Sequence, residues 1–177
     1  MYVYCLFCQT QRCKLIASLL EMRGVDRAFS PQIIRRQRKQ GENLEQLYDL
    51  LPGYVFVYSE KELFDPAFYY GIDGVLRRLG RLEDRFQLTD SDLEFAMNLS
   101  EKNGVIGAVM AIRVGDQVEL KDPLVLGCEG KITQLDVRKQ RARVDFVFNQ
   151  MHCFTWIACD LVKKTDQKEQ APAAEPV

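Results

Sequence analysis

Three cysteines close to the start of the chain, Cys5, Cys8 and Cys13, have a spacing that could bind a metal ion. Zinc is bound by thiolates, in structural sites by four protein ligands such as two cysteine pairs. The chain has no second cysteine pair at ligand spacing, and its single histidine is His152. Cys5 also lies in an apolar run typical of a strand, where residues three apart face opposite sides. We therefore expect reduced thiols that pack as small hydrophobic residues, without a metal or a cofactor.

Nucleophilic catalysis is a second chemistry to consider, because His152 directly precedes Cys153. Neighbouring residues of a strand point to opposite faces, so this imidazole would not reach this thiol. The sequence also contains neither a phosphate-binding loop nor a cluster of metal ligands. We therefore expect a protein that is not an enzyme.

Contact with the phosphates of a nucleic acid is a third chemistry, because cations occur in two clusters. The net charge is −1, so the chain as a whole has no field that attracts nucleic acid. Locally, cationic side chains could bind phosphates, and they could equally be solvated surface groups. The first cluster lies in a predicted hairpin loop or its tip and consists of Arg35, Arg36, Arg38 and Lys39. The second lies around one turn of the C-terminal region and consists of Lys131, Arg138, Lys139, Arg141 and Arg143.

The elements that must hold these residues are mixed in the first half of the chain. Residues 1–7 predict a strand, and Gln11–Arg23 predict a helix between Thr10 as N-cap and Gly24 just past its end. Asp65-Pro66 is typical of a helix start. Further strands are predicted at 27–34, interrupted by a proline, and at 74–80.

The clearest strand signal is the run Tyr54–Tyr58, which follows the pair Pro52-Gly53 at once. Because polar residues do not alternate through it, we expect both faces of this strand to be covered. Thr89–Asp92 resembles a capping box before a helix that ends near Glu101, with an inner face of Leu93, Ala96, Met97 and either Leu99 or Ser100. This order predicts an α+β fold with a small antiparallel or mixed sheet and packed helices.

From residue 113 the pattern changes to strands alone. Arg141–Phe148 alternates with period two, and several short strands within about 50 residues indicate a small β-barrel. The apolar stretch 104–112 is predicted to join two domains, as a mobile linker or as an extra strand packed on either one. The predicted organisation is a first domain at 1–103, the join at 104–112, a second domain at 113–164 and a disordered tail at 165–177.

The sequence also bears on where the protein acts. No run approaches the roughly 18–20 apolar residues of a membrane span, and no basic segment of a secretory signal precedes the first strand. We expect a cytoplasmic protein that acts as a monomer and does not contact a membrane.

Two motifs carry a resemblance to a known family. Val114–Val118 followed by Gly127–Ile132 looks like a KOW motif, whose glycine permits a tight turn between strands of an SH3-like barrel. With the corner Pro52–Val55 upstream, the chain resembles NusG-family transcription elongation factors over about residues 1–164. The resemblance implies an N-terminal NGN domain, a linker and a C-terminal KOW domain.

The resemblance implies that the NGN domain catalyses no reaction. It implies instead that this domain binds the β′ clamp helices of RNA polymerase and suppresses pausing. Tyr4, Leu51 and Tyr54 match family positions in or beside the hydrophobic pocket for these helices, and Phe56 belongs to the same strand. An exposed groove of apolar and aromatic side chains could receive a helix. The alternative is that all four residues are core.

The resemblance also suggests partners for the cations. The segment Arg35–Lys39 falls in the loop that faces upstream DNA or the polymerase in the family, and Arg77, Arg78 and Arg81 follow the same logic beside nontemplate DNA. The second cluster could meet the backbone of an RNA hairpin by shape alone, without aromatic stacking.

Phe148 keeps the aromatic residue that the general factor uses to bind Rho or a small-subunit ribosomal protein. Asn149 and Gln150 replace the glycine and basic residue that follow there, and Met151–Trp156 is also untypical, which speaks against both partners. The chain in this respect resembles specialised paralogues of the LoaP type, which act as processive antiterminators. The alternatives are a housekeeping NusG-type factor and a ribosome-associated KOW protein that binds RNA.

Overall fold

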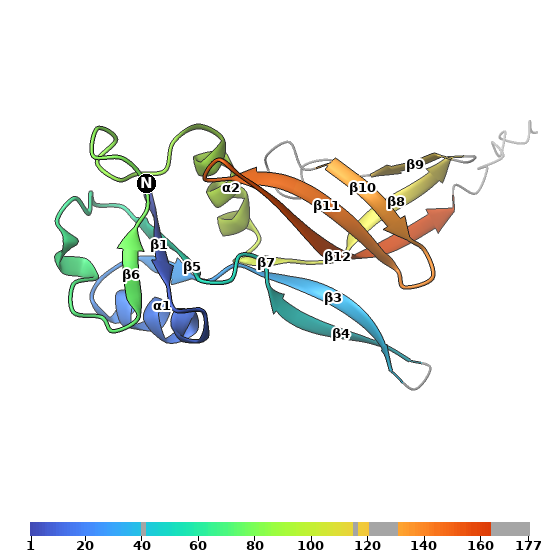
Figure 1. Cartoon of the computed structure of the whole chain (residues 1–177), viewed down its shortest axis with the longest axis horizontal. Helices are drawn as coiled ribbons and strands as arrows, with labels where there is room; N and C mark the ends of the chain where they lie inside the picture. Colours follow the sequence, from blue (N-terminus) through green and yellow to red (C-terminus); the bar gives the residue numbers. More distant parts are fainter. Residues whose placement is uncertain (40–41, 115–116, 121–130, 164–177) are drawn as a thin grey trace, which may run out of the picture.

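The computed structural model of the chain describes residues 1–39, 42–114, 117–120 and 131–163. The glycines of the second motif at 115, 127 and 130, and the tail predicted at 165–177, lie outside the described residues. Within the strands, the side chains of Arg38, Lys39 and Lys131 are also outside this description. The described chain has two short α-helices and three sheets, which confirms a mixed α+β architecture (Figure 1).

The N-terminal sheet has four antiparallel strands in the order β2-β5-β1-β6. All six residues of β5 are buried, because β1 and β2 flank the strand and other elements cover both faces. The absence of polar alternation therefore gave a correct prediction for this strand. The bounds are Tyr2–Cys8 for β1, Arg27–Phe29 for β2, Tyr54–Ser59 for β5 and Val75–Arg78 for β6.

The corner before β5 needs its glycine. Gly53 has φ +89°, and its carbonyl accepts a 2.7 Å hydrogen bond from the amide of Cys8. A Cβ at this position would lie 3.0 Å from the Cys8 carbonyl oxygen and 3.0 Å from the Phe7 ring. Only glycine combines the positive φ with so close an approach of two backbone segments.

The first helix begins later than the sequence predicts. Residues Thr10–Arg12 form a 3₁₀ turn, η1, and α1 spans Cys13–Met22. Gln9 and Arg12 take the two N-cap positions, so the prediction of Thr10 as N-cap was wrong. The buried residues of α1 are Cys13, Ile16, Ala17 and Leu20, and Gly24 ends the helix with φ +90°, as predicted.

The predicted basic hairpin loop is instead part of a long strand. β3 spans Gln32–Lys39 and pairs along its whole length with β4, Glu42–Asp49. Opposite charges face each other across the pair, as at Arg36 and Glu45, which offsets the low strand preference of charged residues. We call β3 and β4 the hairpin arm; Figure 1 shows it projecting beneath the C-terminal strands.

The second helix, α2, spans Asp90–Glu101, with Thr89 at the N-cap as predicted. Asp92 does not complete a capping box, because its carboxylate accepts a hydrogen bond from the C-terminal hairpin. The buried residues of α2 are Phe95, Ala96 and Leu99, whereas Met97 is partly exposed. The expected inner face is therefore wrong at Met97 and omits Phe95. A shorter turn, η2 at Pro66–Phe68, starts where Asp65 accepts a bond from the Ala67 amide, as predicted.

The segment 104–112 carries two strands. β7, Val105–Ile106, runs parallel to β3, and β8, Val109–Val114, runs parallel to β12, so Gly107-Ala108 is the only described stretch between them. Of the two alternatives for this segment, the extra strand agrees with both of its ends, because β7 and β8 are strands. The division at 1–103 and 113–164 itself stays a prediction.

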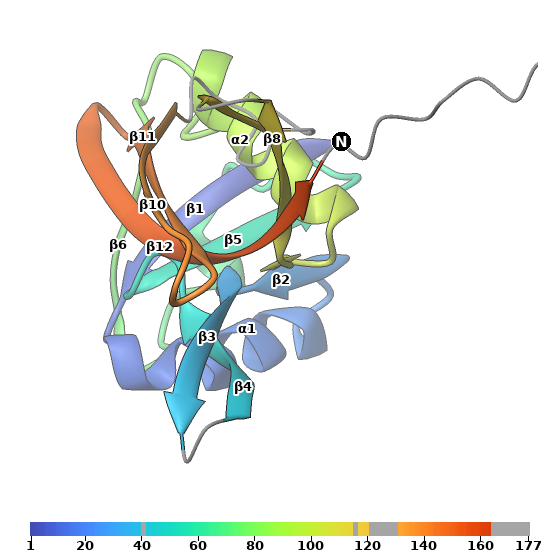
Figure 2. The same ribbon diagram turned by 90° about the vertical axis from the view of Figure 1, so that its right-hand side faces the viewer.

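The C-terminal sheet has five strands in the order β10-β11-β12-β8-β9, and Figure 2 shows its strong curvature. β11, Arg141–Phe148, has the bounds and the alternating burial that its period-two pattern predicts. β12 is one continuous strand, Met151–Lys163. The remaining strands are β9, Gln117–Leu120, and β10, Lys131–Asp136.

Candidate functional site

The two faces of the N-terminal sheet carry separate hydrophobic cores. On one face, Tyr4, Val55 and Val57 pack with α1. On the other, residues of β1 and β5 pack with α2 and the C-terminal sheet. We call this second face the aromatic face; it is formed by Phe7, Leu50, Leu51, Tyr54, Phe56 and Phe95.

Three of the four residues predicted to bind polymerase therefore lie together. Leu51, Tyr54 and Phe56 belong to the aromatic face, where Tyr54 is 8% exposed and Phe56 is fully buried. Tyr4 lies on the opposite face beneath α1 and η2, and its hydroxyl accepts a 2.8 Å bond from the Leu63 amide. The guanidinium of Arg78 lies over the Tyr4 ring at 4.4 Å. The structure thus separates Tyr4 from the other three.

The aromatic face is covered by the residue predicted to bind a partner protein. Phe148, at the end of β11, is fully buried against it. Its ring centroid lies 5.6 Å from Tyr54 in an edge-on arrangement, 5.3 Å from Phe56 and 5.3 Å from Phe95. Phe146 stacks on Phe95 at 5.7 Å. Aromatic pairs at such distances contribute about 0.5–1.5 kcal/mol each beyond the burial of area.

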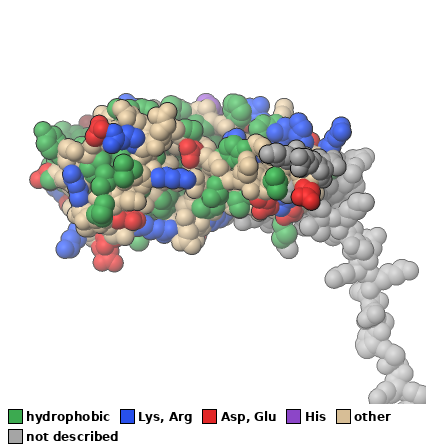
Figure 3. All heavy atoms as spheres, turned by 90° about the horizontal axis from the view of Figure 1, so that it is seen from below, with side chains coloured by type: hydrophobic (Ala, Val, Ile, Leu, Met, Phe, Trp, Pro, Cys, Tyr) green, Lys and Arg blue, Asp and Glu red, His purple; other side chains and the backbone are tan. Residues whose placement is uncertain are grey.

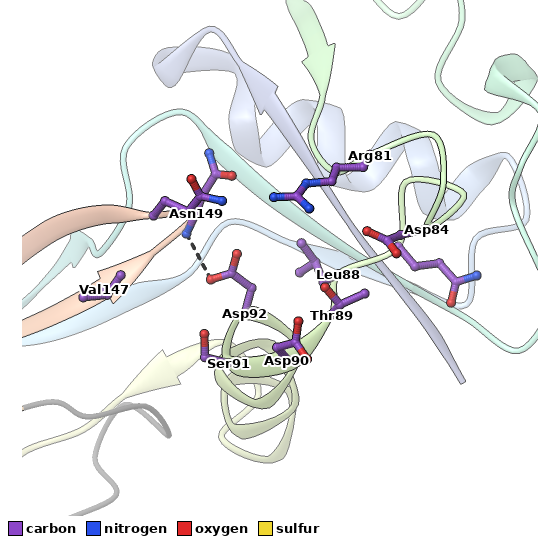
Figure 4. Close-up of a pocket in the computed structure, with 12 residues that line it drawn as sticks. Arg81, Asp84, Leu88, Thr89, Asp90, Ser91, Asp92, Val147 and Asn149 are labelled. Atoms are coloured by element: carbon purple, nitrogen blue, oxygen red, sulfur yellow. Dashed lines mark hydrogen bonds between the residues drawn. The ribbon is translucent and has the colours of Figure 1, made fainter.

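The turn after Phe148 fastens this cover to α2. Asn149 and Gln150 have φ of +49° and +61°, the values of a two-residue hairpin turn that favours asparagine at its first position. The backbone N–H of Asn149 donates a 3.0 Å hydrogen bond to Asp92 Oδ1 (Figure 4). Burial raises the pKa of Asp92, and the bond from Asn149 opposes that rise.

A hollow of about 560 Å³ lies beside this contact, between the N-terminus of α2 and the C-terminal turn. Figure 4 shows Asp84, Asp90 and Asp92 around it with Arg81 opposite. Its lining is mostly polar and includes three carboxylates besides Arg81, which does not suit the phosphate contact predicted for Arg81.

The hairpin arm forms a second contact with the C-terminal sheet. Arg35 donates 3.1 Å bonds to the Trp156 carbonyl and to Thr155 Oγ1. Arg36 binds Glu45 at 2.8 Å and also pairs with Asp160 of β12, and this second hydrogen bond is the largest cause of its raised pKa. Two of the four cations predicted to bind DNA are thus engaged within the molecule. Arg38 and Lys39 lie outside the described side chains.

The described cations of the second cluster lie on β11 and the turn before it. Lys139 and Arg141 both reach Asp136, at 4.0 and 3.3 Å, and Arg143 reaches Asp145 at 2.9 Å. Arg138 is exposed in the same turn. Positive charge on this surface is therefore moderated by two carboxylates. Figure 3 shows that cationic and acidic side chains are also interspersed over the face seen from below.

Four of the five described thiols are buried, and Cys153 is half-buried. Cys5, Cys8 and Cys13 are all buried, as predicted, and burial raises the pKa of Cys8 to about 12. Within the described residues, no group of three His, Cys, Asp or Glu side chains is placed to hold a metal ion. Burial also raises the pKa of Cys153, which disfavours its thiolate form.

Comparisons with known proteins rest on structure alone. No protein-family model matches the chain, and no curated protein is similar in sequence. Among solved structures, NusG from Thermotoga maritima superposes with a TM-score of 0.53 at 14% identity, covering 89% of this chain and 93% of that one. The fold is NusG-like. The Thermotoga structure is described as showing domain interaction in that protein.

Sequence reasoning missed the two aromatic residues at the centre of the covered face. Phe95 is fully buried, and its spacing of four residues to Leu99 was the available signal. Phe146 shares the inward phase of Phe148 in β11, but a period-two pattern does not tell which surface the strand packs against. In the part of the chain that the structure describes, no helix is long and apolar enough to cross a membrane.

Proposed function

We propose that this protein is a NusG-type transcription elongation factor that docks on RNA polymerase through the aromatic face. The observation that carries the proposal is the grouping of Leu51, Tyr54 and Phe56 on one face of a NusG-like fold. The occupant that we propose is the pair of β′ clamp helices. An amphipathic helix lays apolar side chains into such a groove, and aromatic residues supply contact area at low entropic cost.

Docking requires the molecule to open, because Phe148 occupies the place of the incoming helix. The cover hides both predicted interaction sites at once, since Phe148 is itself fully buried. A factor closed in this way binds its partner with an affinity reduced by the fraction of open molecules. We propose that the closed form lowers binding until the polymerase or another partner draws the sheets apart.

Once bound, the factor suppresses pausing and termination, and it acts as a cytoplasmic monomer with domains at 1–103 and 113–164. We propose processive antitermination of the LoaP type, because Asn149 and Gln150 form a turn without the basic residue expected for Rho or ribosomal-protein binding. The second candidate is a housekeeping factor, which the retained Phe148 favours.

Nucleic-acid contacts complete the proposal. An RNA hairpin would bind the second cluster of cations, which consists of Lys131, Arg138, Lys139, Arg141 and Arg143. Upstream or nontemplate DNA would bind the far end of the hairpin arm, which carries Arg38 and Lys39. Arg35 and Arg36 become available for DNA only after the arm leaves β12. For Tyr4, a role in binding would be indirect, through the position of β1.

The test is a titration of a clamp-helix fragment of β′ with the full chain and with the double variant Leu51→Ala and Tyr54→Ala. We expect the double variant to weaken binding by at least about tenfold, since buried aromatic anchors contribute about 2 kcal/mol or more. Leu76→Ala, an exposed residue of β6, is the matched control. Unchanged binding by the double variant would show that the aromatic face is not the docking site. Antitermination itself is measured separately, by transcription through a terminator on a template with its own leader region.

A further inference from the structure

The outer face of β11 and β12 carries two aromatic rings that the proposed function does not use, next to two arginines that it assigns to RNA. Arg143 lies 4.1 Å over the ring of Phe154, and Arg141 lies 4.3 Å over Trp156. The strand register places Trp156 directly opposite Arg143. Phe154 is 61% exposed, so its ring is accessible to a ligand. We call Arg141, Arg143, Phe154 and Trp156 the stacking row.

From this row we infer a binding site for single-stranded RNA, in which bases stack on Phe154 and Trp156 while the two arginines meet phosphates. The inference rests on the RNA contact of the proposed function and changes its form, from a hairpin backbone to unpaired bases. Residues two apart in a strand lie roughly 6.6 Å apart on one face, a step that an extended nucleic-acid strand can follow. Aromatic rings that interleave with cations are the usual platform for unpaired bases.

Charge favours a polyanion at this surface. The turn and strand that carry the row contribute four cations, at 138, 139, 141 and 143, against the two carboxylates Asp136 and Asp145. Each guanidinium covers one face of its ring, and the 61% exposure of Phe154 leaves part of that ring accessible to a base. Phosphates can replace Asp136 and Asp145 as partners of the arginines, because surface ion pairs contribute only about 0–1 kcal/mol.

The row leads into a hollow of about 110 Å³ between the sheet and the hairpin arm. Its lining combines three guanidinium groups with an amide and the indole: Arg35, Arg36, Arg141, Gln37 and Trp156. Such a set of donors suits a phosphate next to a base stacked on Trp156. At the other edge, exposed Gln134 pairs across the strands with Arg143 and offers both a donor and an acceptor. The 2′-hydroxyl of RNA can donate to or accept from such an amide, which is why we assign RNA rather than DNA.

The test is a fluorescence titration of the full chain with a short oligouridine at low salt. The only tryptophan of the chain is Trp156, so a stacking base should quench the intrinsic fluorescence. Phe154→Ala should weaken binding about 5- to 100-fold, and Phe154→Tyr should retain it. Phe64→Ala is the matched control, because Phe64 is also exposed and also lies under an arginine, Arg85, at 5.8 Å.

Salt dependence separates the two contributions. Replacing Arg141 and Arg143 by glutamine should reduce the slope of log affinity against log salt by about 0.7 for each phosphate that no longer meets a guanidinium. Phe154→Ala should lower affinity without changing that slope, because stacking releases no counterions. A slope unchanged by the arginine variant would overturn their assignment to phosphates.

Several outcomes would overturn the inference. They are wild-type affinity in Phe154→Ala, full affinity in Phe154→Leu, an equal loss in Phe64→Ala, or binding without quenching of Trp156. Equal affinity for oligothymidine DNA would overturn the assignment to RNA. Tighter binding of a blunt RNA hairpin than of oligouridine would overturn base stacking and leave the proposed function intact. Conversely, a chain that binds oligouridine as expected but does not bind the clamp helices would contradict the proposed polymerase docking and leave the RNA site intact.

Discussion

The two faces of the N-terminal sheet are covered in different ways. One face is closed by α1, which follows β1 in the chain and packs Ile16 and Leu20 against it. The other is closed by α2 together with Phe146 and Phe148, which come from a different sheet far along the sequence. A cover that is local in sequence forms with the sheet that it covers. A cover contributed by another sheet can leave while the strands beneath it stay paired, which is what a docking face requires.

The largest effect expected from this difference concerns unfolding. Phe148→Ala leaves a cavity among three aromatic rings, and such a change costs about 3–5 kcal/mol. We expect the loss to fall on the contact between the sheets, so that Trp156 fluorescence changes at lower denaturant than the helical circular dichroism of α1 and α2. Noncoincident transitions reported by two probes are the mark of a molecule that no longer unfolds as one unit.

Ile16→Ala is the matched variant on the other face. It removes a fully buried side chain from α1 and should cost about 2–5 kcal/mol. Here the helical signal should shift to lower denaturant, because the sheet loses the helix that belongs to it. If both variants shifted the fluorescence transition and the circular dichroism transition equally, the two covers of the sheet would unfold together, and the proposed difference between them would be wrong.

A smaller effect is expected at Asp92. Asp92→Ala leaves the backbone N–H of Asn149 without its acceptor, which should weaken the closed form by about 1 kcal/mol. Asp92→Asn keeps an acceptor oxygen at this place. Burial raises the pKa of Asp92 in the folded chain above its ordinary 3.8. The stability that Asp92 contributes is therefore complete below pH 3.8 and is lost as the pH rises through the higher folded pKa.

The measurement for Asp92 is the difference in free energy of unfolding between the wild type and Asp92→Asn as a function of pH. A difference is needed because Asp26 and Asp136 have lowered pKa values and contribute with the opposite sign. The wild type should lose stability relative to Asp92→Asn as the pH rises above 3.8. A difference that does not vary with pH would show that Asp92 titrates alike in both states.

Much of the fold follows from local sequence patterns. The uninterrupted run of β5 and the alternation of β11 report burial on both faces and on one face, and the structure confirms both. The corner at Gly53 follows from the conformational freedom of glycine. Each of these depends only on residues close in sequence.

The errors come from competition between local and distant partners. Asp92 has the spacing of a capping box, but the Asn149 amide is its partner in the folded chain. Arg35 and Arg36 look like a loop because they are charged, yet cross-strand and C-terminal partners hold them in a strand. The contact of Phe148 with Tyr54 is likewise beyond periodicity, which shows that a side chain is inward but not what it meets.

The most direct test of the account is the affinity of a β′ clamp-helix fragment for Phe148→Ala compared with the wild type. If Phe148 covers the docking face, its removal should tighten binding, by about tenfold for each 1.4 kcal/mol by which the closed form is weakened. Adding Tyr54→Ala to the same variant should abolish the gain. Equal or weaker binding by Phe148→Ala, in a chain whose helices remain folded, would contradict the claim that the C-terminal sheet covers a polymerase-binding face.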